Sequence, residues 1–246
     1  MRRVTDIICV FRIQLMSMRA EAGPFFLAAL VFPSAMYLFA NAVAGVEATQ
    51  NQSRLRFLAG SIVFSLSLTS ISWLGYLLLE NRFTGRLKLF ATLPLAPSSY
   101  ILGFLGFAFV QAALGTTVLL LIGRVLGVGI RPSVPALTLV IILTVLCLCG
   151  FGVIIAARAR SFTEGSLLTD ALGAGLVFLA PVYYTPETMP HSLRIVSQFL
   201  PTTFAARAVR TTLIGGHQIG GDVLALGVMA VATLALGFKM TKWREN

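Results

Sequence analysis

Long apolar runs separated by short polar segments fill most of the chain. A helix that spans a bilayer needs roughly 20 mostly apolar residues, because an unpaired backbone amide in lipid costs several kcal/mol. Six runs are long enough, and they predict spans at about residues 25–46, 57–79, 100–122, 136–157, 166–185 and 222–240. The pattern therefore predicts an all-α integral membrane protein with a single transmembrane domain over residues 1–246.

The first 23 residues carry a different pattern. Within residues 3–20 the apolar side chains recur on one helical face, and the charged side chains lie elsewhere. This period predicts an amphipathic helix over residues 1–23 that lies in the cytoplasmic headgroup layer. The alternative is a basic leader that only sets the topology. A cleaved signal peptide is not expected, because four arginines precede the first apolar run and no small-residue cleavage site follows a short core.

Two of the segments between apolar runs are themselves half apolar. Residues 80–99 begin with charged side chains, continue with leucines and a phenylalanine, and stop at Pro94. An ordinary loop needs no apolar face, so we expect a short helix that docks in a groove of another protein. Residues 186–215 turn amphipathic and carry three arginines. Pro190 and Pro201 are expected to bound a short helix there, because proline starts a helix well and also stops one.

Composition and charge also indicate a membrane location. The chain is 57% apolar and 11% charged, so a soluble fold would expose large apolar patches. A net charge of +10 could indicate a protein that binds nucleic acid. However, the basic residues stand in short loops between apolar runs, where they act as topology signals. With both termini in the cytoplasm, twelve of the 19 Lys and Arg residues lie inside and seven outside. This bias predicts a multi-pass protein of the cell membrane, with no nucleic-acid partner.

Residue types that perform chemistry are sparse. The chain has no GxxxxGK[ST] motif, so it lacks that device for binding ATP phosphates. His191 and His217 both lie in the last outer loop, without a pair of buried carboxylates beside them. Cys9, Cys147 and Cys149 have neither zinc-site spacing nor the pattern of a disulfide framework. We therefore expect no catalytic, cofactor-binding or metal-binding residues and no enzymatic activity in the isolated chain.

Few polar side chains lie inside the apolar runs. Asp170 stands about one turn inside the fifth run, and a lone carboxylate near the interface is more often hydrated or capping a helix than carrying protons. The second run carries a polar stripe that occupies an arc of about 80° on a helix. Its members are Ser61, Ser65, Thr69, Ser72 and Tyr76. Such a stripe either lines a wet translocation path or packs against another helix, and the sequence leaves both interpretations open.

The segment at 80–99 resembles the cytoplasmic loop of the membrane subunits of type-2 ATP-binding cassette (ABC-2 type) exporters. That loop has a glutamate, a glycine, a leucine-rich turn, and a threonine or serine before proline. The matching residues are Glu80, Gly85, Leu87, Leu89, Thr92 and Pro94. Lys88 stands where the family often has glutamate. The segment at 186–215 is similar to the same family, and its matches in order are Pro186, Met189, Pro190, Pro201, Thr202, Phe204 and Arg210.

The resemblance implies a permease subunit with a coupling loop and an outer gate. Coupling to an ATPase would fall to Glu80, Gly85, Leu87, Leu89, Phe90, Leu93 and Pro94. Residues 186–215 would form a re-entrant helix pair that gates the outer end through Pro190, Phe199, Pro201, Arg207 and Arg210. An amphipathic surface helix without a gating role is the alternative for this segment. The polar stripe of the second span would line the path.

The resemblance also implies partners. Two permease copies, identical or related, would form the path in the lipid bilayer, and two copies of a separate ATPase would bind ATP and Mg. The exported substrate would be hydrophobic or amphipathic: a drug, an antibiotic, a lipid or a lipid-linked glycan. The alternative is a self-sufficient ion-coupled carrier or channel, which would need midplane charges or an inverted repeat. A structural or sensory membrane protein is a further alternative, and the docking helix argues against it.

Overall fold

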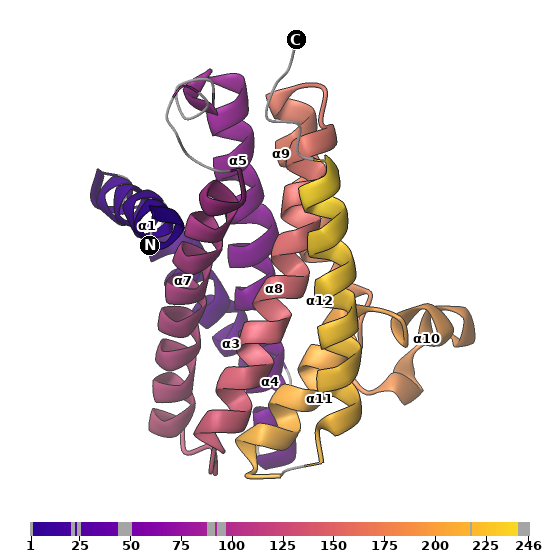
Figure 1. Ribbon diagram of the computed structural model, residues 1–246. Coiled ribbons are helices and arrows are strands. Elements are labelled where there is room, and N and C mark those ends of the chain that lie inside the picture. The colour runs from indigo at the N-terminus through magenta and orange to yellow at the C-terminus, as the bar shows by residue number, and fades with distance from the viewer. Residues whose placement is uncertain are drawn as a thin grey trace.

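The computed structural model is built from helices (Figure 1). It describes residues 2–20, 23, 26–43, 51–87, 92, 97–216 and 218–240, and within these ranges it contains no strand. The long helices are α1 (Arg2–Ala20), α3 (Phe32–Val43), α4 (Asn51–Ser67), α5 (Leu74–Phe83), α7 (Pro97–Val125), α8 (Val134–Arg158), α9 (Phe162–Phe178), α11 (Pro201–Leu213) and α12 (Gly220–Met240). The shorter helical pieces are the π-helices η1 (Leu27–Val31) and η3 (Leu68–Trp73), the 3₁₀ turn η4 (Pro186–Thr188), and α10 (His191–Ser197).

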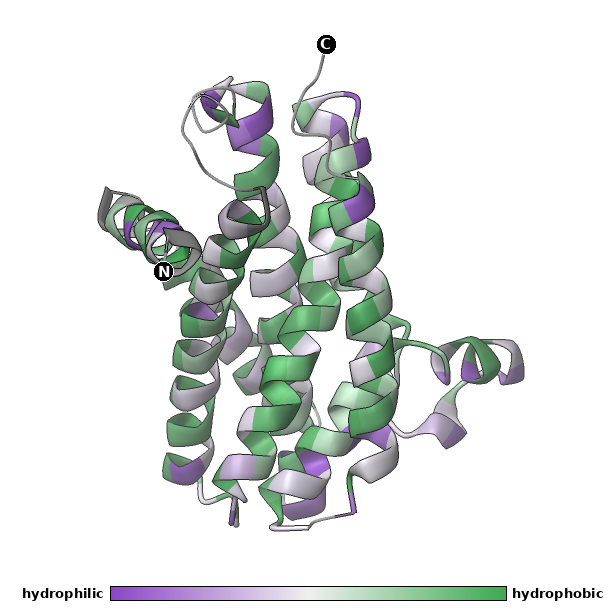
Figure 2. Cartoon of the chain, viewed as in Figure 1, coloured by the Kyte–Doolittle hydropathy of each residue, from purple (hydrophilic) through white to green (hydrophobic). Residues whose placement is uncertain are grey.

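Four helices in the described part of the chain are long and apolar enough to cross a membrane. They cover Asn51–Phe83, Ser99–Val125, Val134–Arg158 and Gly220–Met240. These positions agree with the second, third, fourth and sixth spans that the apolar pattern predicts. Figure 2 shows hydrophobic residues along the middle of α7, α8 and α12, and hydrophilic residues mainly toward the ends of the bundle. The protein is therefore a multi-pass membrane protein.

The first and fifth predicted spans are helical but shorter. The described part of the first consists of η1, with 5 residues, followed directly by α3, with 12. The fifth is α9, with 17 residues, which begins at Phe162 and ends at Phe178 instead of covering 166–185. Six full spans therefore stay a prediction.

Local chemistry explains where α9 begins and ends. At its start the Ser161 hydroxyl accepts a hydrogen bond from the Glu164 N–H, and the Glu164 carboxylate accepts one from the Arg160 N–H. This pairing resembles a capping box. At its end Pro181 disfavours the α conformation of the residue before it, so the helix stops within the predicted span.

The helices form one bundle around α8. Helix α8 contacts α12, α11 and the continuous run α4–η3–α5, while α7 closes the bundle beside α4. In Figure 1, α1 lies across α7 near the end of the bundle where α5 ends and α9 begins. A helix over the N-terminal segment is therefore confirmed, and one side of it is buried on α7, where Val10 is fully buried. Its place in the headgroup layer stays a prediction.

Small residues let α8 and α12 approach closely. A Cβ atom added at Gly150 would lie 2.3 Å from the Thr233 hydroxyl and 2.8 Å from its carbonyl carbon. The Thr233 hydroxyl also donates a hydrogen bond to the Cys147 carbonyl across the same seam, at 3.0 Å. Membrane helices commonly associate through such small residues and interhelical hydrogen bonds. The position of α12 on α8 therefore depends on the absence of a side chain at Gly150.

We expect Gly150→Ala to destabilise the bundle by about 1–3 kcal/mol, the usual cost of overpacking a close contact. Gly227→Ala is the matched control, because Gly227 lies on α12 with nothing within 4 Å of an added Cβ atom. Thermal unfolding in detergent, followed by circular dichroism, measures both. Equal midpoints for the two variants would contradict the close approach of α8 and α12.

Candidate functional site

Most of the polar stripe on the second span is buried inside the subunit. Ser61, Ser65 and Thr69 have no exposed surface. The Thr69 hydroxyl donates to the Ser65 carbonyl of its own helix at 2.9 Å. The Ser61 and Tyr183 hydroxyls lie 3.4 Å apart. Within one subunit these three residues therefore pack the second span against its neighbours.

At the π-helix η3, serine side chains on this span form hydrogen bonds to the neighbouring helix α9, and the two helices pack tightly. The Ser67 hydroxyl, at the junction of α4 and η3, donates to the Gly173 carbonyl of α9 at 2.7 Å. One turn further along, the Ser72 hydroxyl donates to the Thr169 carbonyl at 3.4 Å. A Cβ atom added at Gly173 would lie 2.7 Å from the Ser72 hydroxyl. The two helices are thus held by serine-to-carbonyl bonds across a seam of small residues.

The other end of the stripe opens into a surface cavity. Ser72 is half-buried, Tyr76 is exposed, and both line a cavity of about 290 Å³. Its other lining residues are Leu27, Phe32, Leu68, Trp73 and Asp170. The sequence analysis identified Ser72, Tyr76 and Asp170 as candidates separately and missed the other four. Trp73, which follows Ser72 in the chain, was the sequence feature that could have indicated an aromatic side chain beside the stripe.

Asp170 lies deeper in its helix than the sequence indicated. Because α9 begins at Phe162, Asp170 stands midway along the helix, about 12 Å from its start at the usual helical rise. Its side chain is exposed on the surface of the subunit. In the described part of the chain, Asp170 forms no hydrogen bond or ion pair. In the predicted fifth span an ionisable residue at this position would be uncommon, and such residues commonly mark function.

The predicted coupling segment begins as a continuation of the second span. Helix α5 runs to Phe83, so residues 80–83 belong to this helix and not to the loop. The Thr84 N–H and hydroxyl both donate to the Glu80 carbonyl, at 2.8 and 2.6 Å. Gly85 follows with φ of +78°, a left-handed conformation that glycine adopts readily at a helix end. Gly85 therefore marks the point where the coupling segment leaves the span.

Charged side chains tie this helix end to its surroundings. Glu80 pairs with Arg86 at 3.2 Å, across the turn. Arg82 donates to three carbonyls at the end of α8, those of Ala156, Ala157 and Ala159, at 2.9, 3.3 and 3.0 Å. The carbonyls of a last helical turn have no partner within their own helix, so Arg82 caps α8 from another helix.

The remaining coupling residues have different positions. Leu87 lines a cavity of about 640 Å³ beside Arg82, between α5, α7, α8 and α12. The predicted coupling residues Leu89, Phe90, Leu93 and Pro94 lie outside the described residues. Their docking role stays a prediction.

Prolines break the outer segment where the sequence predicts. Pro190 precedes α10 in an extended conformation, and Pro201 is the first residue of α11. In Figure 1, α10 projects sideways from the bundle and α11 packs within it. Phe199, between the two helices, is 72% exposed, whereas the Pro201 side chain is buried. Residues 186–215 therefore contain α10 and α11, and a re-entrant helix pair at membrane depth stays a prediction.

Arginines hold the irregular backbone of this segment. Arg194 donates to the Pro186 and Glu187 carbonyls at 2.9 and 3.1 Å. Arg210 donates to the Pro181 carbonyl at 2.8 Å and also to that of Val182. The resemblance implies Arg210 as part of the outer gate, and Arg194 is another of the three arginines in this amphipathic segment. In the structure their donors satisfy carbonyls that the breaks in the chain leave without helical partners.

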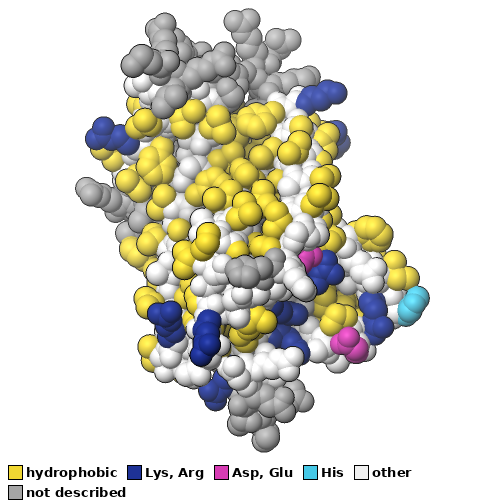
Figure 3. Space-filling model, turned by 60° about the horizontal axis from the view of Figure 1, so that its bottom comes forward, with side chains coloured by type: hydrophobic (Ala, Val, Ile, Leu, Met, Phe, Trp, Pro, Cys, Tyr) yellow, Lys and Arg dark blue, Asp and Glu magenta, His cyan; other side chains and the backbone are white. Residues whose placement is uncertain are grey.

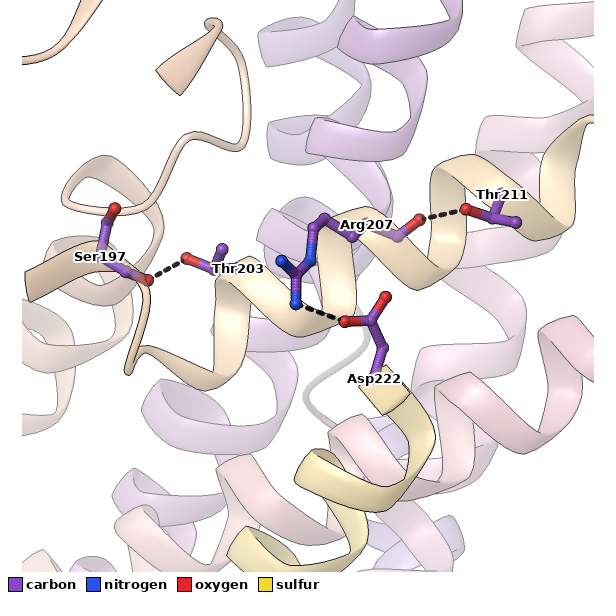
Figure 4. Close-up of polar contacts among 5 residues, drawn as sticks. All are labelled: Ser197, Thr203, Arg207, Thr211 and Asp222. Atoms are coloured by element: carbon purple, nitrogen blue, oxygen red, sulfur yellow. Dashed lines mark hydrogen bonds and ion pairs between the residues drawn. The ribbon is translucent and has the colours of Figure 1, made fainter. Parts of the chain in front are cut away.

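Further polar contacts fix α11 against its neighbours (Figure 4). Arg207 pairs with Asp222 at the start of α12, at 2.5 Å, and its guanidinium lies 5.1 Å from the centre of the Phe204 ring. The Thr203 hydroxyl donates to the Ser197 carbonyl at 2.6 Å, across the turn between α10 and α11. The relative placement of α10, α11 and α12 is therefore specified by side chains as well as by proline.

Positive charge gathers at this end of the molecule, as Figure 3 shows. Arg56 and Arg210 line one cavity of about 500 Å³ between α4 and α11. Burial, and secondly the charge of Arg56, lower the pKa of Arg210 to about 10. At neutral pH Arg210 therefore keeps its charge and its donors.

Residues typical of metal or redox sites do not gather in the described part of the chain. No group of three His, Cys, Asp or Glu side chains there has the geometry to hold a metal ion. Cys9, Cys147 and Cys149 are free, and the last two are buried. His191 is the first residue of α10, and His217 lies outside the described residues.

A match to a known protein family covers most of the chain. The family model described as ABC-2 type transporter matches residues 6–214, which extend from α1 to the end of α11. No curated protein matches the chain.

Arg210 provides a test of the outer segment. Arg210→Met keeps much of the side-chain bulk but leaves the Pro181 and Val182 carbonyls without these donors, which costs about 1–3 kcal/mol for a buried group. We expect a lower unfolding midpoint in detergent. Arg131→Met is the matched control, since Arg131 is an exposed arginine at the same end of the bundle. Wild-type stability of Arg210→Met would mean that these hydrogen bonds do not hold the segment.

Proposed function

Because the chain belongs to the ABC-2 type transporter family and is a transmembrane permease subunit of it, we propose that it forms the export path of an ATP-driven transporter. The family match over residues 6–214, in a chain with long apolar helices, carries this proposal. Two permease subunits, identical or related, enclose the path. Two copies of a separate ATPase bind ATP and Mg on the cytoplasmic side. Both termini of the chain face the cytoplasm of a cell-membrane protein.

Coupling runs through the segment that follows Gly85. Its leucines and phenylalanine dock on the ATPase, and closure of the ATPase pair moves the segment. Arg82, one turn before Gly85, joins the end of α5 to the end of α8. A displacement of the coupling segment therefore moves α5 and the α8–α9 turn together. ATP binding can shift the helices only through contacts that differ between the two states, and the Arg82 junction is our candidate for such a contact.

The path runs along the surface where η3 and α5 meet α9. Ser72 and Tyr76 face it, because both line the cavity that also contains Asp170. The buried members of the stripe, Ser61, Ser65 and Thr69, support the path from behind by packing within the subunit.

The outer helices α10 and α11 form the gate of this path. Helix α10 lies outside the bundle with apolar residues exposed, whereas α11 is packed within it. Pro190 and Pro201 allow the reversal between them, and the bonds of Arg207 and Arg210 hold α11 in place. Non-helical backbone at membrane depth is tolerated against protein or a water-filled cavity, which suits the edge of an exit.

The exported substrate is hydrophobic or amphipathic, because the path has few charges. The drug, antibiotic, lipid and lipid-linked glycan classes all satisfy this description. A self-sufficient ion-coupled carrier is the second candidate, and Asp170, midway along α9, is the observation that favours it. A carrier would transport without ATP. An exporter would require the ATPase.

The coupling proposal is tested by Leu89→Asp. A charge placed in a dry docking groove costs several kcal/mol, so we expect the complex to lose its ATPase subunit or its coupling while the chain still inserts. Thr163→Asp is the control, because it adds the same charge in another turn at the same end of the bundle, where the side chain is exposed. Co-purification and substrate-stimulated ATP hydrolysis measure both. Wild-type transport by Leu89→Asp, or ATP hydrolysis by the chain alone, would contradict the proposal.

The path is tested by cysteine labelling in a background without Cys9, Cys147 and Cys149. Ser72→Cys should react quickly with a charged, water-soluble thiol reagent, and its rate should change when ATP is trapped. Ser65→Cys should react slowly, because Ser65 is buried. Leu121→Cys controls for lipid exposure, since Leu121 is 57% exposed on the apolar surface of α7. Equal rates at all three positions, unchanged by ATP, would remove Ser72 from the path.

A further inference from the structure

The cavity that contains Asp170 has the chemistry of a binding site for a particular charge. We name it the Asp170 pocket. It lies between η1 and α3, η3 and α5, and α9, and has a volume of about 290 Å³. Its lining residues are Leu27, Phe32, Leu68, Ser72, Trp73, Tyr76 and Asp170. No lysine or arginine is among them.

Two π-helical segments border the Asp170 pocket. Leu27 belongs to η1, and Leu68, Ser72 and Trp73 belong to η3. The two segments also contact each other. A π-turn inserts a residue into an α-helix, and such insertions occur frequently at functional sites. Here η3 interrupts the second span between α4 and α5, and η1 leads directly into α3 at the place where the side chains of the pocket converge.

Aromatic rings form one wall of the pocket. The Trp73 and Tyr76 rings are stacked, with centroids 6.4 Å apart and an angle of 23° between their planes. Phe162, at the start of α9, meets the Tyr76 ring edge-on at 5.2 Å. Phe32, on α3, also lines the pocket and is 51% exposed. The face of an aromatic ring carries partial negative charge and attracts cations.

Asp170 is the acidic side chain among the residues that line the pocket. Its carboxylate stands midway along α9, and no basic residue that lines the pocket neutralises it. An unpaired carboxylate in a membrane is costly, so a cation that enters the pocket gains both the Coulombic attraction and the stacking surface. A lipid acyl chain would satisfy the apolar wall and leave the carboxylate unpaired.

We propose that the Asp170 pocket binds the exported substrate as an organic cation with an aromatic or apolar body, and that Asp170 is its counter-charge. This rests on the proposed export function and narrows its substrate class. Trp73 and Tyr76 contact the body of the cation, and the Ser72 hydroxyl supplies a polar contact beside it. The pocket faces the proposed path, because Tyr76 and Asp170 are exposed on the surface of the subunit.

The experiment is equilibrium binding of radiolabelled tetraphenylphosphonium to the complex in nanodiscs of neutral lipid, corrected for empty nanodiscs. We expect Asp170→Asn to weaken binding at least tenfold and Asp170→Glu to restore part of it. Glu187→Gln is the matched control, since Glu187 is an exposed carboxylate outside the pocket. Triphenylphosphine oxide, which is neutral and of similar shape, should bind the wild type and Asp170→Asn equally.

A second measurement needs no change at Asp170. Tetraphenylphosphonium should protect Ser72→Cys from the charged thiol reagent, and triphenylphosphine oxide at the same concentration should protect it far less. The proposal would be overturned if Asp170→Asn bound tetraphenylphosphonium as tightly as the wild type. It would also be overturned if the two compounds protected Ser72→Cys equally. Either result is expected if a lipid chain or the second permease fills the pocket.

Failure of this proposal and failure of the exporter proposal give different results. If tetraphenylphosphonium binds through Asp170 but is transported without ATP, the result contradicts the exporter proposal and supports cation binding in the Asp170 pocket. ATP-driven export of a neutral compound by a complex that does not bind tetraphenylphosphonium would contradict the pocket alone.

Discussion

Each interruption of a helix leaves backbone carbonyls that the bilayer cannot satisfy, and this constraint organises much of the structure. In the described part of the chain, arginine side chains donate hydrogen bonds to many of these carbonyls. Arg82 caps the end of α8, Arg194 holds the turn before α10, and Arg210 holds the turn after α9. In each case the guanidinium reaches several carbonyls at once, which a planar group with five donors does well. The positive charge of the chain therefore has structural uses beyond its effect on topology.

Close packing through small residues is the second feature that holds the helices together. Gly150 admits Thr233 of α12, and Gly173 admits Ser72 of η3. Hydrogen bonds from serine and threonine cross both seams. Lipid tails are as apolar as leucine, so apolar side chains alone give little reason for membrane helices to associate. Backbone proximity and polar contacts supply that reason here.

Arginine capping and close-packed, hydrogen-bonded seams together connect the ends of the molecule to its middle. Arg82 joins the helix that leads into the coupling segment to the turn that leads into α9, and Ser67 and Ser72 join η3 to α9. Asp170 stands on α9 beside this last contact. In the proposed transporter, movement at the cytoplasmic end therefore reaches the Asp170 pocket through a short chain of direct contacts. The proposed outer end is held separately, by the bonds of Arg207 and Arg210.

The sequence by itself determined the features that depend on neighbouring residues. Apolar length located four membrane-crossing helices, helical period located the helix at the N-terminus, and Pro190 and Pro201 located the breaks in the outer segment. Pro181 is also a local signal for the early end of α9, and the predicted span of 166–185 runs past it.

Only the tertiary structure decided which distant groups meet. Arg82 finds carbonyls 74 to 77 residues away, and Ser72 finds one 97 residues away. A helical period cannot tell a buried polar stripe from an open one, because both give the same pattern on one helix. Burial by neighbouring helices made that distinction between Ser65 and Ser72. The same packing gathered Phe32, Trp73 and Asp170 from three segments into one pocket, since the shape between helices is set by how all of them pack together.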